Sequence, residues 1–161
     1  QSLLTSLITS LRNSSYSTII YVEYAHLMLY FLICFTSKWT FSSKIAALFG
    51  FLSVLIGAFG AHGLEGVLIE NQRLETYKTA VNYQFYHTLA LLLVGVLMMS
   101  NPSKYLIRSA KMFVYGILFF SGSLYLLSLT NYTLIGVVTP IGGLFFIFGW
   151  LALYKSFSNI G

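Results

Sequence analysis

Two histidines, His62 and His87, are the side chains best suited to acid–base or ligand chemistry. His62 stands in the stretch GAFGAHGLEG at residues 57–66, three residues before Glu65. His87 follows Gln84 by three residues, so the two side chains share one face of a helix. Ionisable groups inside a membrane are costly, and they often mark proton or ion pathways. The alternatives are therefore a relay between His87 and a glutamate, or a neutral histidine that fixes helix contacts.

Further polar side chains occur at helical spacing later in the chain. Ser121 and Tyr125 are four residues apart, and Thr139 follows in the next apolar run. If a helix enters the membrane near residue 79, a rise of about 1.5 Å per residue places His87 roughly 12 Å inside. Lipid cannot satisfy polar groups, so we expect them to face other helices. We predict one polar layer in the outer half of the membrane, made of Gln84, His87, Ser121, Tyr125 and Thr139.

Neither a metal nor a haem fits these residues. Haem held by His62 and His87 needs both histidines at one depth, whereas His62 lies at the membrane boundary. Zinc lacks a third ligand at a suitable spacing, and Cys34 is the only cysteine. The chain has no Asp for a Ser-His-Asp triad, and it has no nucleophile motif or phosphate-binding loop. We therefore expect no cofactor, no metal and no enzyme activity.

The composition indicates a membrane protein. The 161 residues are 57% hydrophobic and 8% charged, whereas soluble domains carry about 25% charged residues. The net charge of +5 does not indicate nucleic-acid binding, because the basic residues stand singly at the ends of apolar runs. The lipid membrane is therefore the expected partner.

Four apolar stretches are suited to cross about 30 Å of hydrocarbon as helices: 45–61, 79–100, 112–130 and 133–154. Pro140 lies inside the fourth, where the loss of a backbone hydrogen bond predicts a kink. Residues 63–78 hold three of the four glutamates and an apolar face, which predicts a short helix on the membrane surface. The predicted fold class is therefore all-α: a four-helix membrane bundle with an amphipathic surface helix between the first two spans.

Basic residues predict the orientation of this bundle. One side carries Lys38, Lys44, Lys104, Arg108, Lys111 and Lys155. The opposite side carries Arg73 and Lys78, which three glutamates offset. The positive-inside rule therefore places both ends of the four-helix unit in the cytoplasm.

The chain divides into a four-helix domain at 44–155, a tail at 156–161 and an N-terminal extension at 1–43. The extension has an apolar stretch that Glu23 and His26 interrupt. These are buried ionisable groups if the stretch is a fifth span. We favour a leader, an interfacial helix or a segment from outside the natural protein.

Small residues recur at helical spacing in two of the spans. Such stripes let helix backbones approach closely in lipid. We expect them to pack helices within the chain, and a stripe left over would serve a partner. The small residues that we assign to packing are Ser53, Gly57 and Ala61 in the first span and Gly142 and Gly143 in the fourth.

Four motifs in order carry a resemblance to a known family. They are GAFGAHGL at 57–64, YKTAVNYQFYHTLALL at 77–92, FSGSLYLL at 120–127 and TPIGGLFFIFGW at 139–150. From about Lys44 to Lys155 the sequence resembles the membrane family called domain of unknown function 423, whose eukaryotic members are called transmembrane protein 256-like. The resemblance implies a multi-pass protein of the bacterial plasma (inner) membrane or, alternatively, a mitochondrial membrane. It implies no activity.

Two functions follow from these observations. The first is a non-enzymatic membrane protein that acts through helix–helix contacts, as a homo-oligomer or an accessory subunit of a membrane complex. His62 and Glu65 then serve as an anchor at the membrane interface. The alternative is a transporter or channel for protons or small solutes that uses the polar layer around His87. A water-accessible cavity at His87 would favour transport, whereas a dry layer closed by its own hydrogen bonds would remove the basis for it.

Overall fold

The computed structural model describes residues 39–158, and the predictions made for residues 1–38 and for 159–161 concern segments outside that range. The described part is helical and contains no strand. Its elements, in order, are α2 (Trp39–His62), α3 (Glu65–Glu70), α4 (Leu74–Ser100), α5 (Lys104–Gly116), the π-helix η1 (Ile117–Ser121), α6 (Gly122–Thr130), the 3-10 helix η2 (Thr133–Val138) and α7 (Thr139–Phe157).

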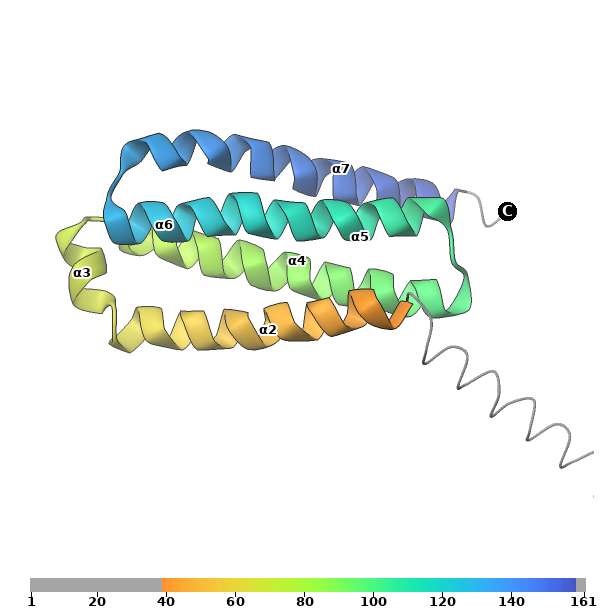
Figure 1. The fold of residues 1–161 in the computed structure, drawn as a ribbon, viewed down its shortest axis with the longest axis horizontal. Helices are drawn as coiled ribbons and strands as arrows, with labels where there is room; N and C mark the ends of the chain where they lie inside the picture. Colours follow the sequence, from red (N-terminus) through yellow and green to blue (C-terminus); the bar gives the residue numbers. More distant parts are fainter. Residues whose placement is uncertain (1–38, 159–161) are drawn as a thin grey trace, which may run out of the picture. The chain divides into compact units, whose positions relative to one another are not determined.

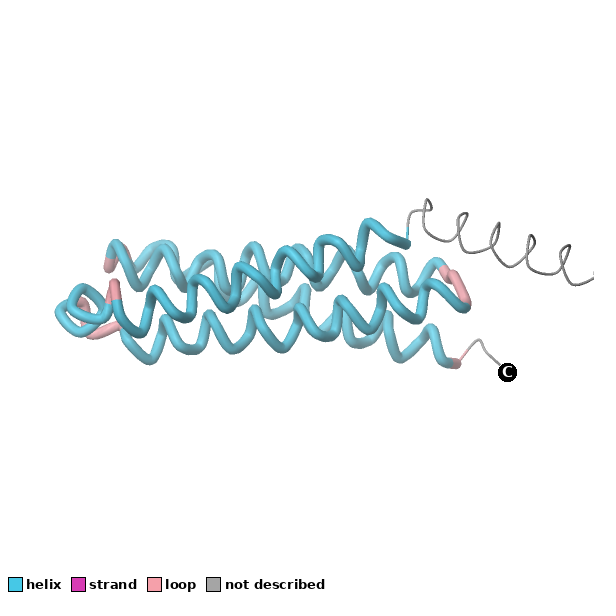
Figure 2. The backbone as a smooth tube through the Cα atoms, turned by 90° about the horizontal axis from the view of Figure 1, so that it is seen from below, coloured by secondary structure: helices cyan, strands magenta, loops and turns pink. Residues whose placement is uncertain are grey.

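Four helical stretches are long and apolar enough to cross a membrane: Ser42–His62, Leu74–Ser100, Lys104–Thr130 and Thr133–Phe157. The predicted all-α, four-helix membrane bundle is therefore confirmed. Figure 1 shows α7, α5 with α6, α4 and α2 in order from the top to the bottom of the view, and Figure 2 shows the same rods running side by side.

Three of the helices begin earlier than their apolar runs. The first begins at Trp39 rather than near 45, the second at Leu74 rather than near 79, and the third at Lys104 rather than near 112. Ser103 caps the third, since its Oγ accepts a hydrogen bond from the Leu106 N–H at 3.2 Å. The first turn of a helix can be charged, as in α4 and α5, and a hydropathy pattern does not detect such a turn.

The predicted surface helix is shorter than expected. The surface helix is limited to Glu65–Glu70, and the rest of the 63–78 segment forms turns and the first residues of α4. Gln72, at φ 56°, lies in the turn that ends this helix. The turn is fastened by Asn71, whose Nδ2 donates to Ser128 O at 3.0 Å and to Leu129 O at 3.1 Å. These two hydrogen bonds hold the end of α3 against the end of α6.

The kink predicted at Pro140 is wrong. Pro140 lies in the first turn of α7, directly after η2. A backbone N–H there has no acceptor within the helix, so proline removes nothing.

The core lies between α4, α5 and α7. Its largest buried side chains include Leu91 and Val94 of α4, Phe113 of α5 and Phe146 of α7. α2 packs on α4, and α7 packs on α5 and η1. The outer faces of α2 and α7 expose rows of large apolar residues, which suits contact with lipid.

Candidate functional site

Gln84 joins three helices through its carboxamide. The Tyr125 hydroxyl of α6 donates to Gln84 Oε1 at 2.8 Å, and Gln84 Nε2 donates to the Phe49 carbonyl of α2 at 3.1 Å. Gln84 is buried. An unpaired amide in an apolar interior is costly, so these two bonds stabilise this particular arrangement of α2, α4 and α6.

Both ring nitrogens of His87 have partners. Nδ1 lies 2.8 Å from the Tyr83 carbonyl, which can only accept, so Nδ1 carries the proton. Trp150 Nε1 of α7 donates to His87 Nε2 at 3.3 Å. These contacts define one tautomer of a neutral imidazole that links α4 to α7.

Aromatic rings surround His87. Its ring stacks on Phe146 with 3.5 Å between centroids and 13° between planes. Phe113 lies 5.8 Å away, and Trp150 presents an edge at 6.3 Å. Apart from its two hydrogen-bond partners, the histidine ring is therefore packed against aromatic surface.

The predicted polar layer therefore does not form one network. Gln84 and Tyr125 are bonded to each other, whereas His87 bonds to Trp150. Thr139 pairs with Ser123, with their hydroxyl oxygens 2.8 Å apart. The Ser121 hydroxyl is buried and has no hydrogen-bond partner among residues 39–158. Four of the five residues therefore divide among three separate hydrogen bonds along the bundle.

His87 lies near the middle of α4. It follows Leu74, the first residue of α4, by thirteen positions, which is about 20 Å along the 27-residue helix. Its depth below the membrane surface stays a prediction.

The sequence did not predict the two aromatic residues that contact His87, because only polar groups were considered as its partners. Phe146 and Trp150 are four residues apart in α7 and contact the imidazole together. Their i, i+4 spacing predicts that both rings lie on the same face of a helix. The sequence does not show that this face meets His87.

His62 and Glu65 lie at one end of the bundle. His62 is the last residue of α2, Glu65 is the first of α3, and both are exposed. No side-chain hydrogen bond joins them in the described part of the chain. Residues 39–158 also contain no group of three or more His, Cys, Asp or Glu that could hold a metal ion.

Comparison with known proteins gives the family. A family model described as "Protein of unknown function (DUF423)" matches residues 56–143. The chain belongs to the DUF423 family. The resemblance seen in the four motifs is thereby confirmed.

Relatives of this DUF423 chain are bacterial membrane proteins. UPF0382 membrane protein SH2409 of Staphylococcus haemolyticus is 47% identical over 113 residues, which cover 70% of this chain and 90% of that protein. UPF0382 membrane protein YwdK of Bacillus subtilis is 41% identical, over 68% of this chain and 89% of its own length. A UPF0382 membrane protein of Haemophilus influenzae is also 41% identical, over 71% of this chain and 92% of its own length. No solved structure matches the chain.

Small residues of the DUF423 motifs lie where helices approach closely. A Cβ built on Gly57 would lie 3.3 Å from Val81 Cγ1, and one on Gly142 would overlap the backbone of Phe120. Ser53 is buried and donates to the Phe49 carbonyl at 2.7 Å. A Cβ on Gly143 has room, at 3.9 Å from the Phe120 ring.

Ala61 is exposed, although we assigned it to packing. Four glycines outside that assignment make close contacts: Gly60 against the Tyr77 ring, Gly95 against Ser43, Gly116 against the Phe146 ring and Gly149 against Phe113. The stripe of α2 that meets α4 thus runs through Gly57 and Gly60 and leaves Ala61 at its edge.

Two clefts flank α2 where it meets α4 near α3. One, of about 290 Å³, is lined by Leu55, Ile56, Phe59, Leu64, Tyr77, Tyr125 and Leu129. The other, of about 210 Å³, is lined by Gly57, Gly60, Ala61, Leu74, Tyr77, Lys78, Val81 and Asn82. Neither is lined by Gln84 or His87.

Proposed function

We propose that this protein is a non-enzymatic membrane protein that acts through helix–helix contacts, as a homo-oligomer or an accessory subunit of a complex in the bacterial plasma membrane. The observation that carries the proposal is how the polar groups of the bundle are used. Gln84, Tyr125 and His87 each bond to a neighbouring helix. Side chains committed in this way hold helices together and present no free reactive group.

The geometry supports transport less well. A proton relay through His87 needs Nε2 to take up a proton, but that nitrogen accepts from Trp150. The flanking rings of Phe146 and Phe113 would have to move before water could reach it. Transport would therefore require α7 to separate from α4 near the middle of the bundle.

The proposal is tested by extracting the protein from its membrane into lipid nanodiscs and measuring the mass of the particle's protein content. We expect a homo-oligomer or a complex with another membrane protein. A monomer without any co-purifying protein would overturn the proposal.

A liposome assay separates the two functions. Purified protein should give no proton flux above empty liposomes, and His87→Gln should leave that result unchanged. A flux in the natural protein that His87→Gln abolishes would establish the transport function instead.

A further inference from the structure

The exposed side of α4 carries a row of residues at the spacing of a helix–helix seam. The intervals alternate between three and four residues along the whole helix, which keeps the row on one face. The residues are Glu75, Lys78, Asn82, Phe85, Leu89, Leu92, Val96 and Met99, and all are exposed. The opposite side of α4 packs on α2, α5 and α6. The row is thus the outward face of α4. The same helix contacts most of the other helices through its opposite side.

Asn82 is the unusual member of this row. It follows the first residue of α4 by eight positions, about 12 Å along the helix and within the span. Its side chain is exposed and makes no hydrogen bond to any residue in 39–158. A carboxamide that faces hydrocarbon without a partner is costly, and acyl chains cannot satisfy it. A protein group from outside the described bundle would meet this need.

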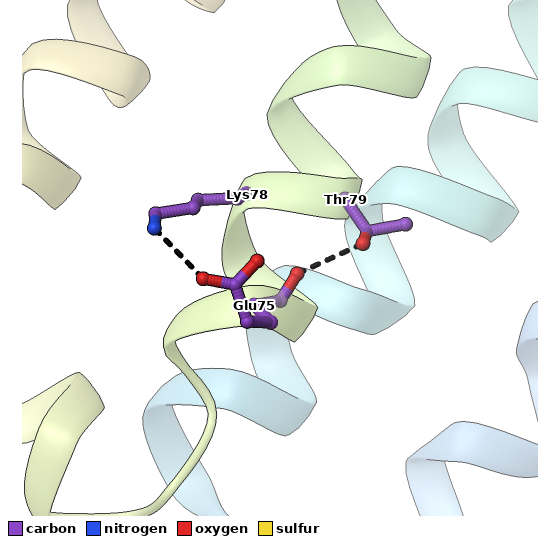
Figure 3. A network of polar contacts seen from close by, with 3 residues as sticks. All are labelled: Glu75, Lys78 and Thr79. Carbon is purple, nitrogen blue, oxygen red and sulfur yellow. Dashed lines mark hydrogen bonds and ion pairs between the residues drawn. The ribbon is translucent and has the colours of Figure 1, made fainter.

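The charged end of the row is paired within each copy. Lys78 Nζ lies 2.8 Å from Glu75 Oε1, and the Thr79 hydroxyl donates to the Glu75 carbonyl at 2.8 Å (Figure 3). The two charged side chains remain 83% (Glu75) and 56% (Lys78) exposed. Each copy therefore carries a neutral ion pair at this end of the face.

Beside Asn82, the surface is hollow. The cleft of about 210 Å³ there is walled by Gly57, Gly60 and Ala61 of α2 and by Val81 of α4. Residues this small leave room for a side chain of an approaching helix.

We propose that α4 pairs with α4 of a second copy of this chain along this row, with the two Asn82 carboxamides hydrogen-bonded to each other. This inference rests on the proposed function and identifies the partner as a second copy of this chain. Two copies inserted in the same orientation are related by a two-fold axis along the membrane normal, which places equal residues opposite each other. A carboxamide both donates and accepts, so Asn82 is its own complement, while Lys78 and Glu75 stay paired with each other within each copy. A single Asn among apolar seam residues fixes the register of such a pair.

Cysteine crosslinking in native membranes tests this seam in a Cys34→Ser background. Leu89→Cys lies on the row and is matched by Leu151→Cys on α7, because the two leucines are 50% and 51% exposed. Under mild oxidation we expect disulfide-linked dimers at Leu89→Cys in at least about tenfold higher yield than at Leu151→Cys. Equal yields at both positions would overturn the proposal.

Asn82→Leu then tests the hydrogen bond. The substitution exchanges an exposed polar group for an apolar one, so the monomer folds as before, and we expect dimer affinity to fall about tenfold. Asn82→Gln retains a carboxamide and should retain most of the dimer. An unchanged dimer in Asn82→Leu would refute the role of Asn82.

The same measurements separate this inference from the function on which it rests. A complex with a different protein, and no crosslink at Leu89→Cys, would overturn the α4 pairing while the accessory role stands. A monomer in nanodiscs without crosslinks in membranes would overturn both.

Discussion

Gly142 and its neighbour Gly143 give a sharp test of how α7 packs on the bulged third span. A Cβ on Gly142 would overlap the Phe120 backbone nitrogen and lie 2.6 Å from Phe120 Cα. Phe120 belongs to the π-helix η1, so its backbone cannot yield unless α7 or η1 moves. A Cβ on Gly143 would lie 3.9 Å from the Phe120 ring, which is an ordinary contact.

The two alanine variants therefore isolate the cost of the clash. Both replace glycine within α7, and both gain the same helix propensity, about 1 kcal/mol. Gly142→Ala alone adds overpacking against a neighbouring backbone, which costs about 1–3 kcal/mol and occasionally more. We expect Gly143→Ala to be as stable as the natural protein or more so, and Gly142→Ala to be less stable than Gly143→Ala by about 1–3 kcal/mol.

The free energy of unfolding is measured by titrating the purified protein from a mild detergent into a denaturing one, with circular dichroism or tryptophan fluorescence as the signal. Gly143→Ala is the matched control, because it changes the same residue type one position along the same helix. Equal stability of the two variants would refute the close approach of α7 to η1, and with it the reason for glycine at this position.

Three further outcomes are expected. Tyr125→Phe removes the donor to Gln84 Oε1 and should lower the free energy of unfolding by about 0.6–1.7 kcal/mol; in a Gln84→Leu background the same change should cost much less, and additive losses would contradict the bond. Asn71→Ala frees two carbonyls at the end of α6 and should cost about 1 kcal/mol in the same titration, whereas no loss would show that the turn is held otherwise. In a cysteine-free background, an impermeant thiol reagent applied to intact cells should label Glu70→Cys and not Asn101→Cys, because the positive-inside rule predicts that the α3 end lies outside. The reverse pattern would overturn that predicted orientation.

Sequence alone predicted the number of spans and their order, because a helix that crosses hydrocarbon must be apolar over most of its length. It placed three helix starts too late, at 45, 79 and 112, because polar and charged first turns are not apolar. It also predicted that Gln84 and Tyr125 lie in one polar layer, and the structure bonds these two side chains. The sequence did not single out this pair, because polar stripes on separate helices do not show which of their members meet.

The remaining features of the site depend on how helices meet. His87 finds Trp150 and Phe146 on α7, about sixty residues later in the chain, and Gly60, Gly95 and Gly149 matter because of side chains on other helices. Periodicity in one segment shows which residues share a face, but not which helix that face meets or at what rotation. Those are decided by packing among all the helices together, and so only the tertiary structure shows a histidine engaged at both nitrogens and an asparagine left facing outward.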